Sequence, residues 1–144
     1  EMADLKLVIG AKDGKSHQVV ITEDKAEIFH NMKIGETLSG DDLGFSGYEF
    51  LITGGSDKCG FPMRKGIQES RKRVLIGEGV GFCGKKRRLG KKTTRKTQHG
   101  LLRRRTVCGE RITKMIHQVN VKVIKEGSQS LGGASAESPA QETA

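Results

Sequence analysis

Short apolar runs separated by glycine-rich turns are the feature that most limits what this chain can fold into. Each run is long enough for one strand, and the 20 glycines are about twice the usual share. Asp13-Gly14 stands between the first two runs and predicts a tight hairpin. The clearest runs are 4–9, 17–22, 48–53 and 71–79.

Order is expected to return at 106–124, which ends in an alternating strand pattern with Val119, Val121 and Val123 on one face and polar residues on the other. Residues 23–30 leave two interpretations open, a short helix or a strand with a bulge. With 4% aromatic residues and no Trp, the core is expected to be aliphatic. Five to seven strands with glycine turns favour a mainly β fold, a small Gly-rich β-barrel with a basic extended segment and a disordered acidic C-terminal tail.

Charge is strongly segregated along the chain. Residues 1–57 contain 5 basic and 11 acidic residues, a net charge of −6. Residues 58–125 contain 21 basic and 3 acidic residues, a net of +18, and residues 126–144 carry −3. This asymmetry predicts that one side of the molecule binds a polyanion such as RNA.

The domain organisation follows the same pattern. We expect a β-barrel body at 2–84, a basic RNA-binding segment at 85–105, returning strands at 106–126 and a disordered tail at 127–144. The segment 85–105 has 11 basic residues and no acidic one, so it is expected to be mobile until RNA binds. It contains no Phe or Tyr, which argues against a platform for stacking single-stranded bases.

Several patterns imitate catalytic or metal sites. The segment Gly79–Lys85 resembles a phosphate-binding loop, but a strongly basic run follows it instead of an amphipathic helix. The three cysteines, Cys59, Cys83 and Cys108, and the four histidines lack metal-ligand spacing. An enzyme using Cys59 or the Gly79 loop therefore stays a minor alternative. We expect no catalysis, no cofactor, no metal and no small-molecule substrate.

Apolar runs here fall short of the roughly 18–20 residues that a membrane span needs. Three widely spaced cysteines do not form a disulfide framework, which favours a reducing compartment. The sequence predicts a cytoplasmic protein without a membrane partner.

The stretch GGSDKCGFPM at 54–63 is the most specific motif in the chain. With its flanks, from Ile52 to Ile67, it closely resembles the central motif of the ribosomal protein S6e family of the small subunit. The segment Arg103–Gly109 resembles a later element of that family, and the likeness covers about residues 4–125. Three features depart from it: Cys108 stands where the family usually has Arg, residues 85–100 look longer than usual, and an acidic tail stands where eukaryotic members continue into a long basic helix. The short length suggests an archaeal member.

The resemblance implies a β-barrel protein embedded in the small ribosomal subunit and held mainly by ribosomal RNA. It implies neighbouring ribosomal proteins as partners, a place in cytoplasmic ribosomes and no enzymatic activity. The alternative is an extra-ribosomal RNA- or DNA-binding protein with a similar β-barrel. In the motif, Gly54 and Gly55 are expected at a tight turn, and Phe61, Pro62 and Met63 are expected to anchor the loop by packing.

Two sets of site residues follow. The expected RNA-binding residues are Lys58, Arg64, Lys65, Arg71, Lys72, Arg73, Lys85, Lys86, Arg87, Arg88, Lys91, Lys92, Arg95, Lys96, Arg103, Arg104 and Arg105. The motif residues are Gly54, Gly55, Asp57, Gly60, Phe61, Pro62 and Met63.

Overall fold

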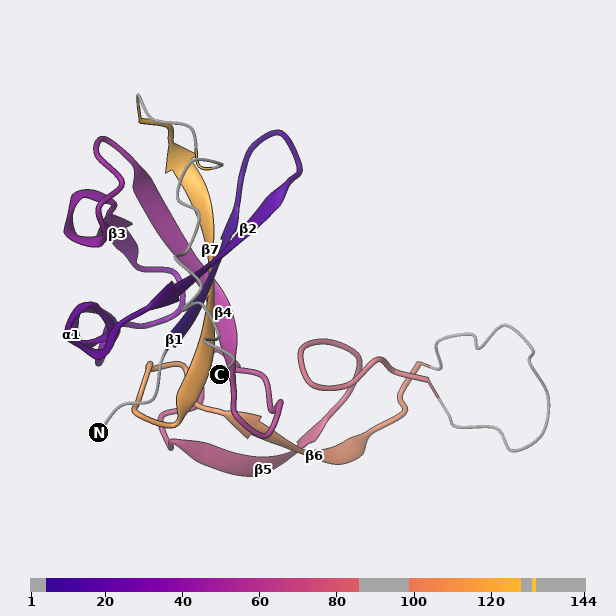
Figure 1. The fold of residues 1–144 in the computed structure, drawn as a ribbon. Coiled ribbons are helices and arrows are strands. Elements are labelled where there is room, and N and C mark those ends of the chain that lie inside the picture. The colour runs from indigo at the N-terminus through magenta and orange to yellow at the C-terminus, as the bar shows by residue number, and fades with distance from the viewer. Residues whose placement is uncertain (1–4, 86–98, 128–130, 132–144) are drawn as a thin grey trace, which may run out of the picture.

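Seven strands in two sheets form the framework of the computed structural model, which describes residues 5–85, 99–127 and 131 (Figure 1). The larger sheet has the strand order β2-β1-β7-β4-β3 and the smaller sheet consists of β5 and β6. The strands of the larger sheet are β1 (Leu5–Gly10), β2 (Ser16–Ile21), β3 (Thr37–Ser39), β4 (Glu49–Asp57) and β7 (Ile116–Lys125). Those of the smaller sheet are β5 (Arg71–Ile76) and β6 (Arg103–Cys108). The mainly β fold class is confirmed.

The β1–β2 hairpin forms where the sequence predicts it. The two strands pair antiparallel from Leu5 opposite Ile21 to Gly10 opposite Ser16. Gly14 has a φ of 83° in the connecting turn, a conformation that glycine adopts without steric cost. On its other side β1 runs parallel to β7, which in turn pairs antiparallel with β4.

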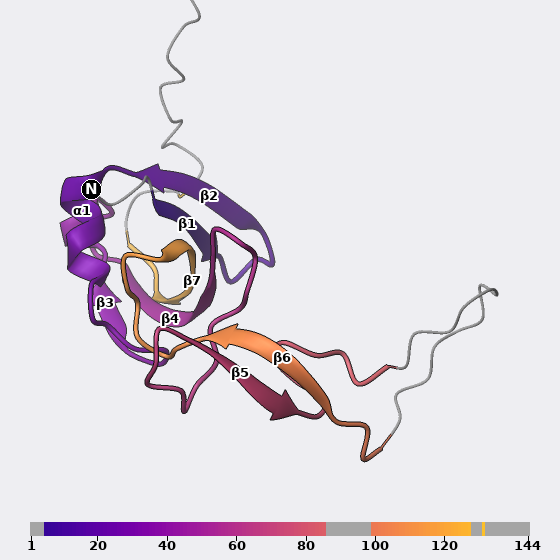
Figure 2. The same ribbon diagram turned by 90° about the horizontal axis from the view of Figure 1, so that it is seen from below.

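The expected closed barrel does not form, because β2 and β3 remain at opposite edges of the sheet and do not pair. The chain between them forms the short helix α1 (Glu23–Ala26) and the 3-10 turn η1 (Glu27–Phe29). Ala26 and Phe29 have no exposed surface, so this helical segment covers the core where a barrel would close by strand pairing. Figure 2 shows the sheet curving around β7 with α1 and β3 on one side. The open interpretation of 23–30 is resolved in favour of a helix.

Alternating side chains build the core of the larger sheet. In β7, Val119, Val121 and Val123 are 0–5% exposed, as the sequence pattern predicts. Each such side chain contributes about 1.5–3 kcal/mol relative to leaving it in water. The expectation of an aliphatic core is only partly met, because Phe45, Tyr48 and Phe50 form an aromatic cluster within it, with ring centroids 5.8–6.4 Å apart.

The β5–β6 hairpin projects from the larger sheet and has a small core of its own (Figures 1 and 2). Its strands pair antiparallel from Arg71 opposite Cys108 to Ile76 opposite Arg103. The core cluster is Ile76, Phe82 and Val107. The last three residues of the expected basic segment, 103–105, therefore lie in a strand. The expected tail falls outside the described residues except for Gly127 and Leu131, and Leu131 packs against the main core.

Candidate nucleic-acid interface

The Gly-Gly pair of the central motif lies inside β4 and not at a tight turn, so the expectation for Gly54 and Gly55 was wrong. The register between β4 and β7 shifts on both sides of the pair, between Ile52 and Gly54 and between Ser56 and Asp57. A Cβ on Gly55 would lie 2.3 Å from the carbonyl oxygen of Gln118. Gly55 therefore allows the β7 backbone to approach β4 closely, which no other residue permits without displacing a strand.

After β4 the motif turns back along the strand that it has just left. Gly60, with a φ of 83°, donates its N–H to the carbonyl of Asp57 at 3.0 Å. Met63 then donates to the carbonyl of Gly55 at 2.9 Å, and its side chain is buried. Phe61 and Pro62 are half-buried. The turn is thus fastened to β4 by backbone bonds and by the Met63 side chain.

The returning motif also joins the β5–β6 hairpin to the larger sheet. Cys108 donates its backbone N–H to the carbonyl of Pro62 at 2.8 Å. Arg64 donates to the carbonyl of Cys108 at 3.0 Å, so residues 62–64 add a short parallel pairing to the end of β6. The motif is therefore the connection that sets where the hairpin projects.

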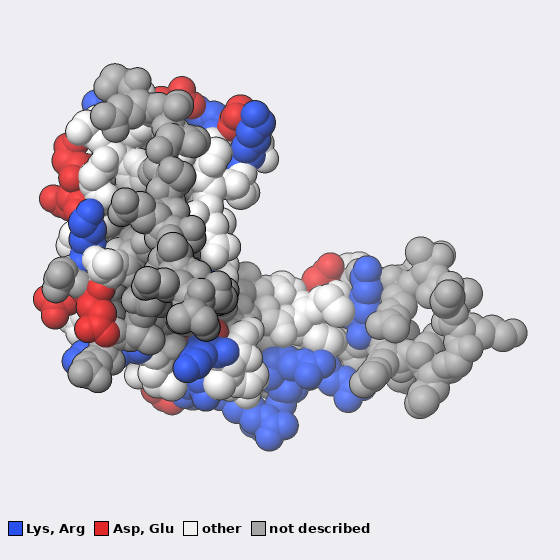
Figure 3. All heavy atoms as spheres, in the orientation of Figure 1, with Lys and Arg blue, Asp and Glu red and all other residues white. Residues whose placement is uncertain are grey.

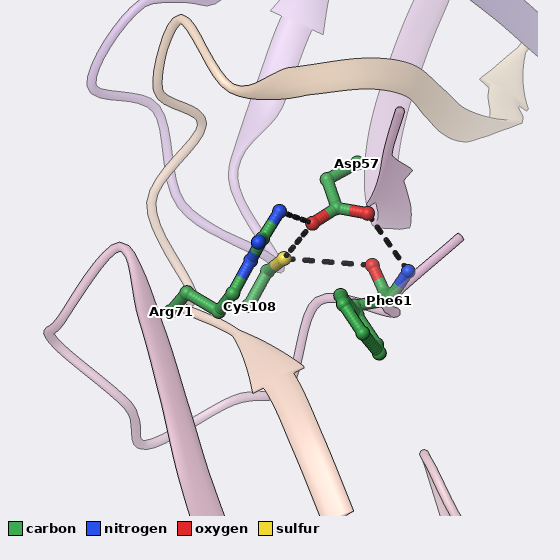
Figure 4. A network of polar contacts seen from close by, with 4 residues as sticks. All are labelled: Asp57, Phe61, Arg71 and Cys108. Carbon is green, nitrogen blue, oxygen red and sulfur yellow. Dashed lines mark hydrogen bonds and ion pairs between the residues drawn. The ribbon is translucent and has the colours of Figure 1, made fainter. Parts of the chain in front are cut away.

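Asp57 is the polar centre of this connection (Figure 4). Its side chain is almost fully buried and accepts hydrogen bonds from the N–H of Phe61 at 2.8 Å and from the thiol of Cys108 at 3.4 Å. It also forms an ion pair with Arg71 of β5. Burial raises the pKa of the carboxyl, but the bonds from Phe61, Cys108 and Arg71 outweigh it, so the pKa lies below its ordinary value of 3.8.

Cys108 is part of the same network and does not reach the surface. Burial, followed by the neighbouring Asp57 carboxylate, raises the pKa of its thiol from 9.0 to about 11. The thiol therefore stays protonated at neutral pH and acts as a donor to Asp57. Nothing in the sequence indicated this role, because Asp57 and Cys108 lie far apart in the chain.

The expected RNA-binding residues divide into engaged and free cations. Arg71 is paired with Asp57, and its guanidinium carbon lies 5.0 Å from the centre of the Phe61 ring. Lys72 is paired with Glu69, and Arg64 donates to the carbonyl of Val80 at 2.7 Å. These three side chains hold parts of the protein together.

A second group is exposed and has no ion pair with any described residue. It includes four arginines of the hairpin, Arg73 on β5 and Arg103, Arg104 and Arg105 on β6. Arg105 also lies over the Phe82 ring, 5.5 Å from its centre. The remaining exposed members are Lys58, Lys65 and Lys85. Seven expected residues lie outside the described part of the chain: Lys86, Arg87, Arg88, Lys91, Lys92, Arg95 and Lys96.

The surface charge is divided between the two parts of the molecule. Figure 3 shows Lys and Arg gathered along the β5–β6 hairpin, whereas Asp and Glu gather around α1 and β3. The only acidic residues between 58 and 125 are Glu69, Glu78 and Glu110. Of these, Glu69 pairs with Lys72 and Glu110 accepts from the N–H of Gly66 at 2.8 Å. The hairpin thus presents a positive surface that acidic neighbours do little to neutralise.

The glycine-rich segment that imitates a phosphate-binding loop contains a tight turn. Gly79 and Phe82 bond to each other across a tight turn, and the described residues up to Lys85 show no helix after it. No group of three His, Cys, Asp or Glu side chains suited to a metal occurs in the described ranges. Likewise, none of the helices described there is long and apolar enough to cross a membrane. Cys59 and Cys83 are exposed free thiols.

Comparisons with known proteins agree on one family. The family model of ribosomal protein S6e matches residues 5–136. The proteins named small ribosomal subunit protein eS6 from Methanosphaera stadtmanae and Methanococcus maripaludis are 38% and 41% identical to the chain over 133 residues. These matches cover 92% of this chain and 92% and 95% of the relatives. The protein of the same name from Methanocella arvoryzae is 37% identical over 90% of this chain and 84% of its own length.

Proposed function

The chain belongs to the ribosomal protein S6e family, and from this premise we propose that it is a structural component of the small ribosomal subunit that binds folded ribosomal RNA through its β5–β6 hairpin. Its partners are then ribosomal RNA and neighbouring ribosomal proteins, and it acts in cytoplasmic ribosomes. It acts by binding and not by catalysis.

The observation that carries this proposal is the group of four exposed arginines at 73 and 103–105. Arginine presents a planar fork of donors that fits phosphate oxygens, and it is charged at every physiological pH. Four such side chains on one small hairpin, with no carboxylate partner among the described residues, repel one another. A polyanion relieves this repulsion and gains affinity by releasing its condensed counterions.

The hairpin suits a rigid anchor because the connection at its base is fixed. Asp57, Arg71 and Cys108 tie β4, β5 and β6 together at one point. Holding the arginines in place before binding reduces the entropy lost when RNA is bound. The larger sheet, with its acidic surface around α1, is then left for solvent or protein neighbours.

Sedimentation of the tagged chain from its own cells tests this function. We expect the chain to migrate with small subunits and to stay with them through a moderate-salt wash. A variant with Arg103→Gln, Arg104→Gln and Arg105→Gln should be released by that wash in much larger amounts. A chain that migrates free of ribosomes, or with other nucleic acid, would instead support the extra-ribosomal alternative.

A further inference from the structure

A pocket of about 490 Å³ lies where the central motif, the turn at 79–83 and β6 meet. Its lining includes Phe61 and Pro62 of the motif, Gly81 and Phe82 of the turn, and residues 104–106 of β6. This volume lies within the usual range for small-ligand sites, roughly 300–1,000 Å³. The three segments come from distant parts of the sequence, and no motif indicated that they form one site.

The lining of the pocket is cationic. Arg73, Arg104 and Arg105 contribute to it, and no acidic residue does. Arg73 lies directly opposite Thr106 in the β5–β6 pairing, so Arg73, Thr106 and Arg104 lie on the same face of the hairpin. The pocket therefore offers guanidinium groups to an anionic ligand without a competing carboxylate.

The free edge of β6 adds backbone donors to this site. The backbone N–H and carbonyl of Cys108 point away from β5, since they bond to Pro62 and Arg64. Because backbone groups alternate in direction along a strand, those of Thr106 also point away from β5. Thr106 lines the pocket, and its N–H lies on the side of β6 that faces away from β5. It can donate a hydrogen bond there to a phosphate oxygen.

An aromatic ring completes the set. Phe61 is half-buried and lines the pocket, and the guanidinium carbon of Arg71 lies 5.0 Å from the centre of its ring. Phe82 also lines the pocket but is only 7% exposed, so Phe61 is the more exposed of the two aromatic residues there. An aromatic ring beside arginines is the combination that receives unpaired bases of RNA.

We propose that this pocket receives one unpaired nucleotide, with its base against Phe61 and its phosphate on Arg73, Arg104 and the N–H of Thr106. The inference rests on the proposed function and names the RNA feature that the hairpin recognises. A free nucleoside 5′-phosphate and a nucleotide within RNA would present the same groups to the pocket. The surrounding arginines favour a nucleotide within ribosomal RNA. The basic segment at 85–105 contains no Phe or Tyr, and in this proposal Phe61 of the central motif supplies the aromatic ring.

The test compares two RNA stems that differ by one bulged nucleotide, at fixed salt. The full chain should bind the bulged stem about tenfold more tightly than the fully paired stem. Phe61→Leu keeps the apolar packing and removes the ring, and it should reduce this ratio to near one. Arg104→Gln should also lower the ratio.

Arg103→Gln is the matched control, since it removes the same charge from the residue next to Arg104, and Arg103 does not line the pocket. It should weaken binding to both stems equally and leave their ratio unchanged. If the ratio is near one in the unmodified chain, or falls equally in Arg103→Gln, the pocket assignment is wrong. If neither stem binds in a salt-dependent manner, the proposed function itself fails. Thermal melting of each variant shows whether it is folded.

NMR titration with adenosine 5′-monophosphate and with inorganic phosphate shows whether the pocket binds the base or only the phosphate. The mononucleotide should shift the amide signals of Phe61, Gly81 and Thr106, and phosphate alone should shift Thr106 but not Phe61. Identical shifts with both ligands would contradict a base site. Binding of the free mononucleotide as tight as that of the bulged stem would contradict RNA as the source.

Discussion

Asp57 shows how one buried carboxylate can position the hairpin that we propose binds RNA. Its three donors come from the motif turn, from β5 and from β6, so a single side chain fixes the base of the hairpin. Removing a buried acceptor leaves its donors without partners, which costs more than the hydrogen bonds themselves contribute. Asp57 and Arg71 are therefore positioning residues, and the exposed arginines are the proposed contact residues.

Replacement of Asp57 by Asn should destabilise the fold by about 1–3 kcal/mol at pH 6. Because the folded pKa of Asp57 lies below its ordinary value of 3.8, its contribution is fully present above about pH 4. That contribution is lost as the pH falls through the folded pKa. The difference in unfolding free energy between the two proteins should therefore shrink from pH 6 to pH 3 in urea denaturation. A difference that is absent at pH 6, or equal at both pH values, would rule out this role.

At the scale of elements, the sequence predicted strands better than it predicted how they close into a fold. Alternation in β7, the Asp13-Gly14 turn and the apolar run of β5 are local signals, and all three gave correct elements. The prediction of a closed barrel was wrong because closure requires the edge strands β2 and β3 to pair. The helical segment at 23–29 lies between them in the chain and covers the core instead. No local pattern reports which strand will remain an edge.

The motif glycines were misjudged for a related reason. A Gly-Gly pair predicts a turn by composition. Gly55 is instead needed because a Cβ there would collide with the carbonyl oxygen of Gln118, 63 positions later in the chain. The network of Asp57, Arg71 and Cys108 is equally non-local. The charge asymmetry, in contrast, could be found from sequence, because strand pairing keeps residues 71–73 and 103–105 on one hairpin.

Gly55→Ala should destabilise the protein by about 1–3 kcal/mol, because the new methyl group would force β7 away from β4. Gly10→Ala is the matched control in the same sheet, since a Cβ there would lie 3.6 Å from the carbonyl of Val121, an ordinary contact. It should change stability by less than about 1 kcal/mol. Equal effects of the two substitutions in thermal or urea unfolding would show that the close approach at Gly55 is not what requires glycine.

On the scale of the whole molecule, the larger sheet and the β5–β6 hairpin differ in charge and in the role that we propose for each. The larger sheet supplies the core and an acidic surface, and the hairpin carries the exposed arginines away from it. Such a division separates stability from binding, because exposed arginines contribute little to the folded state. Variants of the hairpin should accordingly lose RNA affinity while keeping the fold.

The salt dependence of RNA affinity tests this central claim most directly. The logarithm of the binding constant for a ribosomal RNA fragment should fall steeply with the logarithm of salt, by roughly 0.7–0.9 for each phosphate neutralised. With Arg103, Arg104 and Arg105 all changed to Gln, the slope should become shallower by about 2–3 while the melting temperature changes little. A slope near zero in the unmodified chain, or an unchanged slope in the variant, would contradict the account.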